Sequence, residues 1–203
     1  PGLEAPVVPV STVPPAETAA AGPAQLGVVT DLAGVTPLGI PPPSNTAPQA
    51  IPVIALGDSV MLGAAEELQA RGVDVVDAQV SRQFSTFVPE LETIRGNGLL
   101  GSVVIVHLGT NGSFPQSSLD SMMELLWDVP VVVFVTGKAD RPWVAGNNEK
   151  IRALPESWEN TTVVDWEVLG PQCPGDCFYD DDIHLNQAGQ NYYADIMATV
   201  IGL

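Results

Sequence analysis

From residue 51 to the C-terminus, short continuous apolar runs alternate with amphipathic stretches. The runs cover residues 51–56, 73–80, 103–108, 131–135 and 161–168. Apolar residues at helical spacing predict helices over residues 60–70, 84–94, 119–126 and 186–201. Runs of this length suit strands buried on both faces, and their alternation with helices is typical of repeated βαβ units. The pattern predicts an α/β domain over residues 51–203, a three-layer α/β/α sandwich around a parallel, flavodoxin-like five-stranded sheet of order 2-1-3-4-5.

Residues 1–50 have a different character, rich in Pro, Ala, Thr and Val and without helical or strand periodicity. Such a segment is typical of a linker or an extended arm, and we expect an arm that lies against the domain. The chain opens on Pro1 rather than Met, from which we expect an upstream part that holds a membrane or export signal.

The charge balance is strongly acidic, with 7 Lys and Arg against 24 Asp and Glu and a formal net charge of −17. Nucleic acids and anionic membrane surfaces are bound through basic patches, so neither is expected as a partner. The sequence contains no apolar run long enough to span a bilayer and no signal peptide pattern.

The two cysteines, Cys173 and Cys177, flank a Pro-Gly pair that favours a tight turn. This spacing predicts a small disulfide loop, which stabilises the fold by only about 2 kcal/mol and therefore mainly shapes the loop. A disulfide indicates an oxidising, extracytoplasmic compartment, whereas the alternative is two free thiols. A zinc site would need more Cys or His nearby, and neither a metal nor a cofactor is expected.

Polar residues follow the first three predicted strands of the domain. Ser59 follows the first strand, Ser81 and Arg82 follow the second, and Thr110 and Asn111 follow the third. In a parallel sheet of the predicted order these three loops are neighbours at the carboxyl ends of the strands, where ligands bind. We expect one crevice there, with Ser59 in the middle.

A serine hydroxyl becomes a good nucleophile when a base accepts its proton, and histidine suits this task near neutral pH. His107 lies inside the third strand, where we expect a structural role, so His184 in a polar loop is the better base. In the acidic run before it, Asp181 is best placed to orient the histidine, Asp180 is a weaker candidate and Asp182 should point aside. The alternatives are a solvated acidic loop or a calcium site.

An attacked ester develops a tetrahedral oxyanion, which needs hydrogen-bond donors fixed in advance. The candidates are the Ser59 N–H at the start of a helix, the Asn111 side-chain amide and a backbone N–H at Ser81 or Arg82. Taken singly, each of these residues also fits an ordinary turn or cap.

The strings Gly57-Asp58-Ser59-Val60, Gly109-Thr110-Asn111 and Asp181-Asp182-Ile183-His184 resemble blocks I, III and V of the SGNH (GDSL-type) hydrolases. The resemblance covers about residues 51–203 and extends to the SGNH domain of bacterial acyltransferase-3 membrane proteins. The closer likeness rests on Val60-Met61-Leu62-Gly63-Ala64, Val80-Ser81-Arg82-Gln83-Phe84, His107-Leu108-Gly109-Thr110-Asn111-Gly112, Arg141-Pro142-Trp143 and Phe178-Tyr179-Asp180-Asp181.

This resemblance implies that Ser59 is the nucleophile, His184 its base, Asp181 the partner of the base and Asn111 an oxyanion donor. It also implies a domain outside the membrane that takes part in O-acylation, typically O-acetylation, of a cell-surface or cell-wall glycan. The acyl donor would come from a membrane domain of the same polypeptide, and residues 1–50 would be the connecting stretch.

The chain departs from the family in block II, where Ser81 or Arg82 replaces the usual glycine. A backbone N–H can still serve there if the side chain turns away. Arg82 is either a contact for an anionic group or a structural ion pair. Further candidates for substrate binding are Asp58, Ser81, Arg141 and Trp143. The alternative for Trp143 is that it caps the core.

The leading hypothesis is acyl transfer from an acyl-Ser59 intermediate to a glycan hydroxyl. In the first alternative the protein is a secreted carbohydrate esterase or deacetylase, in which water takes the acyl group. Both reactions share the acyl-enzyme, so the sequence does not separate them. The second alternative is a non-catalytic glycan-binding module that keeps the fold.

Overall fold

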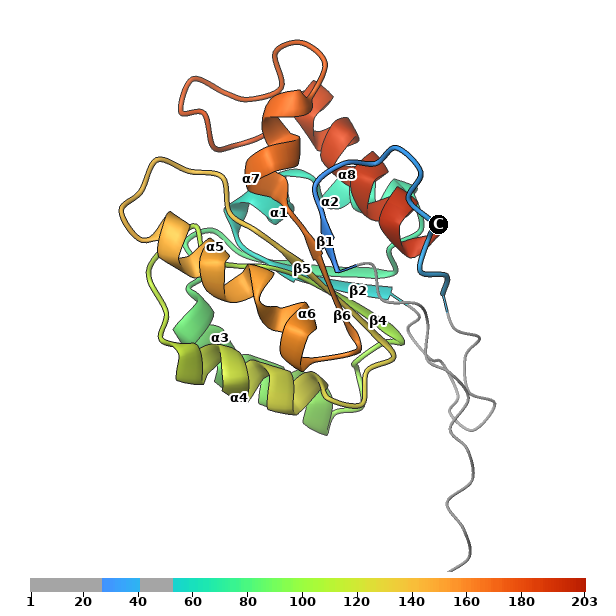
Figure 1. The fold of residues 1–203 in the computed structure, drawn as a ribbon, viewed down its shortest axis with the longest axis vertical. Coiled ribbons are helices and arrows are strands. Elements are labelled where there is room, and N and C mark those ends of the chain that lie inside the picture. Colours follow the sequence, from blue (N-terminus) through green and yellow to red (C-terminus); the bar gives the residue numbers. More distant parts are fainter. Residues whose placement is uncertain (1–26, 41–52) are drawn as a thin grey trace, which may run out of the picture.

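The structure, a computed structural model, describes residues 27–40 and 53–203 and has three layers (Figure 1). The strands are β1 (Val28–Val29), β2 (Val53–Gly57), β3 (Val75–Ala78), β4 (Val103–His107), β5 (Val131–Val135) and β6 (Thr161–Val164). The α-helices are α1 (Ser59–Gly63), α2 (Ala65–Ala70), α3 (Phe84–Gly96), α4 (Gln116–Leu126), α5 (Val144–Arg152), α6 (Leu154–Ser157), α7 (Trp166–Leu169) and α8 (Gln187–Ile201), and Gly170–Gln172 forms a 3₁₀ turn.

All described strands are parallel and lie in one sheet in the order β1-β6-β5-β4-β2-β3. The α/β class and the order of the five predicted strands are confirmed. The predicted strand number is wrong, because the sheet has six strands. The order places the loops after β2, β3 and β4 side by side, as the crevice requires.

The sixth strand, β1, comes from the Pro-rich segment and pairs with β6 at the edge of the sheet. The N–H groups of Val163 and Asp165 donate to the carbonyls of Gly27 and Val29, at 2.8 and 2.9 Å. Further along, the Leu38 N–H donates to the Val200 carbonyl in α8 at 2.9 Å. Residues 27–40 thus lie against the domain, whereas the predicted boundary between residues 50 and 51 falls outside the described residues.

Several element bounds differ from the predicted ones. The run 73–80 forms a strand only over Val75–Ala78, and the run 161–168 is divided between β6 and α7. The division falls at Asp165, a buried carboxylate that accepts hydrogen bonds from the Thr136 hydroxyl and the Arg152 guanidinium. The predicted helix over residues 60–70 is broken at Ala64, and α5 and α6 had no counterpart among the predicted helices.

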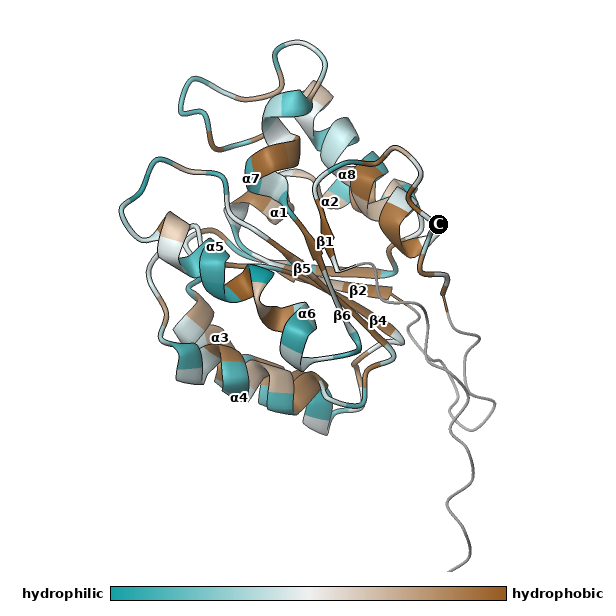
Figure 2. Ribbon diagram, viewed as in Figure 1, coloured by the Kyte–Doolittle hydropathy of each residue, from teal (hydrophilic) through white to brown (hydrophobic). Residues whose placement is uncertain are grey.

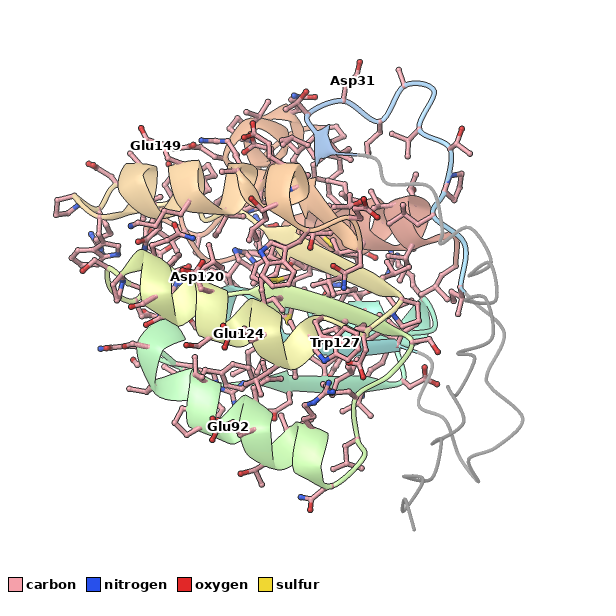
Figure 3. All side chains as sticks on the ribbon, turned by 60° about the horizontal axis from the view of Figure 1, so that its bottom comes forward. Asp31, Glu92, Asp120, Glu124, Trp127 and Glu149 are labelled. Atoms are coloured by element: carbon pink, nitrogen blue, oxygen red, sulfur yellow. A yellow bond between two sulfur atoms is a disulfide. The ribbon has the colours of Figure 1, made fainter. Side chains whose placement is uncertain are left out.

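The sheet separates two apolar layers, which Figure 2 shows as brown helix faces turned toward the strands. Val53 and Ala55 of β2 face the layer with α1, α2, α7 and α8, whereas Ile54 and Leu56 face α3, α4, α5 and α6. Both faces of each central strand are therefore buried, which explains their unbroken apolar runs. Charged residues occupy the outer surface, among them Glu92 on α3 and Glu124 on α4 (Figure 3). No helix among the described residues is long and apolar enough to cross a bilayer.

The predicted disulfide between Cys173 and Cys177 is confirmed, and its loop is fixed to the start of α8. The Asn186 side chain caps α8 by accepting the N–H groups of Ala188 and Gly189, and its amide donates to the Asp176 carbonyl at 3.0 Å. Gly189 lies so close to the loop that a Cβ atom there would overlap the Cys177 carbonyl oxygen. The loop and the helix can approach only because residue 189 has no side chain.

Replacement of Gly189 by Ala is expected to lower the free energy of unfolding by about 1–3 kcal/mol, because backbone must shift to admit the new methyl group. Chemical denaturation of the purified chain measures this change. Gly146→Ala in α5 is the matched control, since nothing lies within 4 Å of the position that its Cβ atom would occupy, and it should stabilise by up to about 1 kcal/mol. Equal effects of the two substitutions would contradict the close approach.

Candidate active site

Ser59 is the first residue of α1, two residues after the end of β2 at Gly57. The buried Asp58 carboxylate caps this helix and accepts the Val60 N–H at 3.0 Å. This cap turns the chain sharply from strand into helix and leaves Ser59 half-buried at the carboxyl end of β2. Asp58 was also a candidate for substrate binding, but its side chain is fully buried beneath the helix start.

The His184 imidazole joins Ser59 to Asp181 although 125 residues separate Ser59 from His184. Its Nε2 lies 2.9 Å from Ser59 Oγ, and its Nδ1 lies 2.6 Å from Asp181 Oδ2. Such a chain can pass a proton from the hydroxyl to the ring while a carboxylate orients the ring. The geometry brings the three sequence-predicted residues together.

The Asp181 carboxylate is held by three donors. Besides the His184 ring, the N–H groups of Ile183 and His184 donate to its Oδ1 at 3.0 and 2.9 Å. The hydrogen bond from the His184 side chain, followed by these backbone hydrogen bonds, lowers the pKa of Asp181 to about 2. Asp181 is therefore ionised at any pH near neutrality, and its carboxylate orients the His184 ring through the contact with Nδ1.

The other two aspartates of the run face elsewhere. Asp182 has a positive φ of 56° and forms an ion pair with Lys138, whose Nζ lies 2.7 Å from its Oδ1 and donates also to its carbonyl. Asp180 is exposed and lines a cavity on the outer side of the loop. Of the three aspartates, Asp181 thus contacts the His184 ring, whereas Asp180 and Asp182 both line the cavity. Among residues 27–40 and 53–203, no three His, Cys, Asp or Glu side chains lie close enough together to hold a metal ion.

The block II segment lies beside Ser59, with Ser81 exposed and in the left-handed region at a φ of 60°. The Arg82 N–H makes a long hydrogen bond of 3.4 Å to the Gln79 carbonyl. The half-buried Asn111 amide donates to the Arg82 carbonyl at 3.3 Å and keeps a second N–H for another acceptor. Blocks II and III therefore touch at the predicted oxyanion position.

The Arg82 guanidinium points away from the crevice into the interior. It donates to the carbonyls of Gly57 and Asp77, at 3.2 and 2.6 Å, and forms ion pairs with Asp77 and Glu90. Its side chain is only 2% exposed. Of the two roles considered for this side chain, the structure shows the ion pairs, and a contact with an anionic group of a ligand stays a prediction.

The Arg141-Pro142-Trp143 string contributes one residue to the loop after β4. Trp143 is half-buried and donates its indole N–H to the Thr110 carbonyl at 3.2 Å, so it supports block III from behind. Arg141 is exposed and its guanidinium contacts the Asp140 carbonyl at 3.2 Å. Its proposed contact with substrate remains a prediction.

Two asparagines in α5 were missed by the sequence analysis. Asn147 is buried and donates to the carbonyls of Gly109 and Gly112 at 3.1 and 2.9 Å, and its oxygen accepts the Phe114 N–H. Asn148 pairs in the same way with both backbone groups of Gly137. These amides fix the loops after β4 and β5. The only sequence signal was an Asn-Asn pair in a polar stretch, which is equally common on helix surfaces.

His107 is fully buried in β4, with Nδ1 2.9 Å from the Tyr193 hydroxyl of α8. Burial lowers the pKa of its imidazole, which therefore stays neutral, and only the nearby Asp58 charge works in the opposite direction. This histidine joins the sheet to α8 and is remote from solvent.

Comparison with known proteins places these residues in context. No family model matches the chain. It is 30% identical to the peptidoglycan O-acetyltransferase OatA of Listeria monocytogenes over 149 residues, which are 73% of this chain and 24% of that protein. It is 26% identical to the O-acetyltransferase OatA of Staphylococcus aureus over 146 residues, 71% of this chain and 24% of that protein. The chain thus spans about a quarter of the length of these curated relatives.

Solved structures agree with this result. The C-terminal catalytic domain of peptidoglycan O-acetyltransferase A from Streptococcus pneumoniae, solved with a methylsulfonyl adduct, matches with a TM-score of 0.65 and 25% identity, covering 75% of this chain and 93% of that one. A member of the lipolytic G-D-S-L family from Veillonella parvula has the same fold, with a TM-score of 0.55 and 17% identity over 71% of this chain and 96% of that one. The relatives, the fold and the three sequence blocks agree, and the chain belongs to the SGNH (GDSL-type) hydrolase family.

Proposed function

We propose that this chain is the catalytic domain of an O-acetyltransferase that acetylates a cell-wall glycan through an acetyl-Ser59 intermediate. The observation that carries the proposal is the hydrogen-bonded chain from Ser59 Oγ through His184 to Asp181. The likeness to peptidoglycan O-acetyltransferases supports the acetyl group and the glycan.

In the first half-reaction, Ser59 Oγ attacks the acetyl carbonyl of the donor while His184 Nε2 accepts the hydroxyl proton. The C–O bond to the donor then breaks, and the imidazolium returns this proton to the leaving oxygen. The products are acetyl-Ser59 and the free donor alcohol. Asp181, ionised and bound to Nδ1, stabilises the imidazolium between the two proton transfers.

In the second half-reaction, a glycan hydroxyl takes the place of the donor. His184 removes its proton as its oxygen attacks the acetyl carbon, and the proton then passes to Ser59 Oγ as the ester to the enzyme breaks. If water enters instead of the glycan, the same steps release acetate, which is the esterase alternative.

The tetrahedral intermediates need donors for the oxyanion, and we assign the Ser59 N–H and the Asn111 amide to this role. Residues in the first turn of a helix have no acceptor for their N–H groups within the helix, and α1 begins at Ser59. The Arg82 N–H is the third candidate, and its long bond to Gln79 is weak enough to be exchanged for an oxyanion.

The same proposal gives the chain an extracytoplasmic setting. The Cys173–Cys177 disulfide supports a site in an oxidising compartment. We further propose that the acetyl donor comes from an acyltransferase-3 membrane domain of the same polypeptide, joined to this domain by the Pro-rich segment.

Ser59→Ala is expected to abolish transfer, with a loss of at least about 10³-fold, because it removes the hydroxyl that accepts the acetyl group. The assay gives the purified chain an activated acetyl ester, with and without an oligosaccharide, and follows acetate and acetylated sugar separately. Acetylated sugar supports the transferase, and acetate alone supports the esterase. If there is no turnover and a serine-directed phosphonate does not label Ser59, the result supports the alternative of a non-catalytic glycan-binding module.

The two histidines should respond in opposite ways to replacement by Ala. His184→Ala removes the base and should reduce activity by about 10³-fold or more with little change in stability. His107→Ala leaves a cavity and an unpaired Tyr193 hydroxyl, so it should cost roughly 2–4 kcal/mol of stability while activity persists in the folded fraction. Activity and denaturant unfolding are measured on both variants, and the reverse pattern would overturn the assignment of the base.

Asp181 should make stability depend on pH in the acid range. Because its pKa is lowered from 3.8 to about 2, its interactions stabilise the folded chain above about pH 4, and this stabilisation is lost as the pH falls toward 2. Solvent screening of a side chain that is 46% exposed keeps the contribution below about 1 kcal/mol. Urea titrations between pH 2 and pH 5 measure the free energy of unfolding, which should fall less steeply with falling pH for Asp181→Asn than for the wild type. The same pH dependence in both proteins would contradict the contribution of Asp181.

A further inference from the structure

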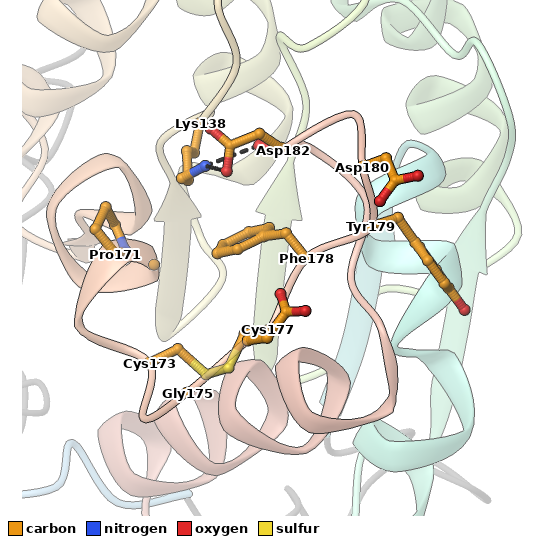
Figure 4. Close-up of a pocket in the computed structure, with 11 residues that line it drawn as sticks. Lys138, Pro171, Cys173, Gly175, Cys177, Phe178, Tyr179, Asp180 and Asp182 are labelled. Carbon is orange, nitrogen blue, oxygen red and sulfur yellow. Dashed lines mark hydrogen bonds and ion pairs between the residues drawn. A yellow bond between two sulfur atoms is a disulfide. The ribbon is translucent and has the colours of Figure 1, made fainter.

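A cavity of about 420 Å³ opens between the disulfide loop and the loop that carries Asp181 and His184 (Figure 4). We call it the acceptor cavity. None of the residues assigned to the reaction lines it, although it lies directly beside them. The residues that line it are Lys138, Gly170, Pro171, Cys173, Gly175, Asp176, Cys177, Phe178, Tyr179, Asp180 and Asp182.

One wall of the acceptor cavity is paired with the segment that holds the base. Phe178 forms an antiparallel bridge with Leu185, and the Tyr179 N–H donates to the His184 carbonyl at 2.8 Å. Paired strands lie about 4.8 Å apart, so a ligand in the cavity is separated from His184 by a single backbone segment. The cavity is therefore within reach of a chain molecule whose neighbouring unit lies at Ser59.

The walls offer both kinds of contact that a sugar unit uses. A sugar ring presents hydroxyl groups around its edge and apolar C–H groups on its faces. In Figure 4 the side chains of Tyr179 and Asp180 lie at the outer edge of the cavity, on the other side of the backbone segment from Phe178. There Tyr179, which is 58% exposed, offers an apolar ring, and the Asp176 and Asp180 carboxylates accept hydrogen bonds. The Lys138 ammonium donates two hydrogen bonds to Asp182 and lies over the Phe178 ring, so it fixes the wall of the cavity.

The charge of the lining restricts the ligand further. Three carboxylates, those of Asp176, Asp180 and Asp182, face one ammonium group, that of Lys138, so the lining has a net charge of −2 (1 − 3). Lys138 is already paired with Asp182, and neither Asp176 nor Asp180 has an ion-pair partner among the described residues. An anionic ligand would be repelled, and a neutral or amine-bearing one would be accepted.

The acceptor cavity is also held in shape before a ligand arrives. The Cys173–Cys177 bond closes one side, and the Lys138 ammonium lies 4.0 Å from the centre of the Phe178 ring on the other. Trp166 supports Phe178 from within the core, with ring centres 6.1 Å apart. A site with fixed walls loses little entropy on binding. The volume also falls in the range of small-molecule sites, about 300–1,000 Å³.

We propose that the acceptor cavity binds an uncharged or amine-bearing sugar unit of the acceptor glycan, next to the unit that receives the acetyl group at Ser59. This inference rests on the proposed function, because it names a subsite for the acceptor of that reaction. It assigns Tyr179, Asp176 and Asp180 to recognition of the glycan and leaves formation of the acetyl-enzyme to Ser59, His184 and Asp181.

The first test measures binding without turnover. Calorimetry measures the affinity of the Ser59→Ala variant for an uncharged N-acetylglucosamine oligosaccharide. The double variant Ser59→Ala/Tyr179→Ala should bind this oligosaccharide about tenfold more weakly. Trp127→Ala is the matched control and should leave binding unchanged. This aromatic side chain is 63% exposed at the end of α4, does not line the cavity, and α4 packs on the opposite face of the sheet from Phe178. No binding by Ser59→Ala, or equal binding with and without Tyr179→Ala, overturns the proposal.

The second test addresses charge. The double variant Asp176→Asn/Asp180→Asn should reduce, by about tenfold, the preference for the neutral oligosaccharide over the same oligosaccharide oxidised to carry carboxylates. Glu92→Gln/Glu124→Gln, on the outer faces of α3 and α4, removes the same number of charges and should leave the preference unchanged (Figure 3). Equal changes in the two double variants would show a general charge effect and overturn the proposed contact.

The two proposals fail in different ways. Acetate release from the activated ester without added sugar reports the acetyl-enzyme alone, and the Tyr179 and Asp176/Asp180 variants should leave its rate within about twofold of wild type. Binding that depends on Tyr179, without transfer to sugar, would support the cavity and contradict the transferase. Transfer to sugar that is unaffected by these variants would support the transferase and contradict the cavity.

Discussion

The guanidinium group of Arg82 is the interaction on which the arrangement of the site depends. It binds the carbonyl of Gly57, two residues before Ser59, and the carbonyl and carboxylate of Asp77 at the end of β3. Its own carbonyl accepts the Asn111 amide. One buried cation thus connects the segment before the nucleophile, the block II segment and the proposed oxyanion donor. A buried charge is strongly unfavourable without its partners, so these groups are held in one arrangement.

The histidine side of the site is fixed by a second, more exposed set of charges. Asp181 orients the ring, whereas the ion pair of the next residue, Asp182, with Lys138 fixes the turn to the loop after β5. The positive φ of Asp182 directs its side chain away from the ring. Three chemically identical side chains in a row therefore have separate roles, because the backbone of a tight turn directs successive residues to different sides.

These contacts explain how much of the structure could be predicted from the sequence. The central strands were predictable because burial on both faces requires continuous apolar runs. The grouping of Ser59, Asp181 and His184 was predictable because the fold brings the strand ends and the last loop together. Strand β1 was not predictable, since two valines in a Pro-rich segment become a strand only through pairing with β6. The same is true of Asn147, whose role depends on carbonyl groups 35 and 38 positions away in the sequence.

The exposure of the His184–Asp181 pair bears on the choice between transfer and hydrolysis. Their side chains are 43% and 46% exposed, so solvent water has access to the base. The base cannot distinguish the two acceptors, because it removes a proton from an oxygen in either case. A transferase on this scaffold must therefore favour the sugar by holding its hydroxyl in place, since well-oriented groups reach effective concentrations of about 10⁵ M or more. In the proposed function, rigid walls beside the base serve that purpose, and the chemistry at Ser59 leads to transfer rather than hydrolysis to the extent that the glycan is bound before water attacks.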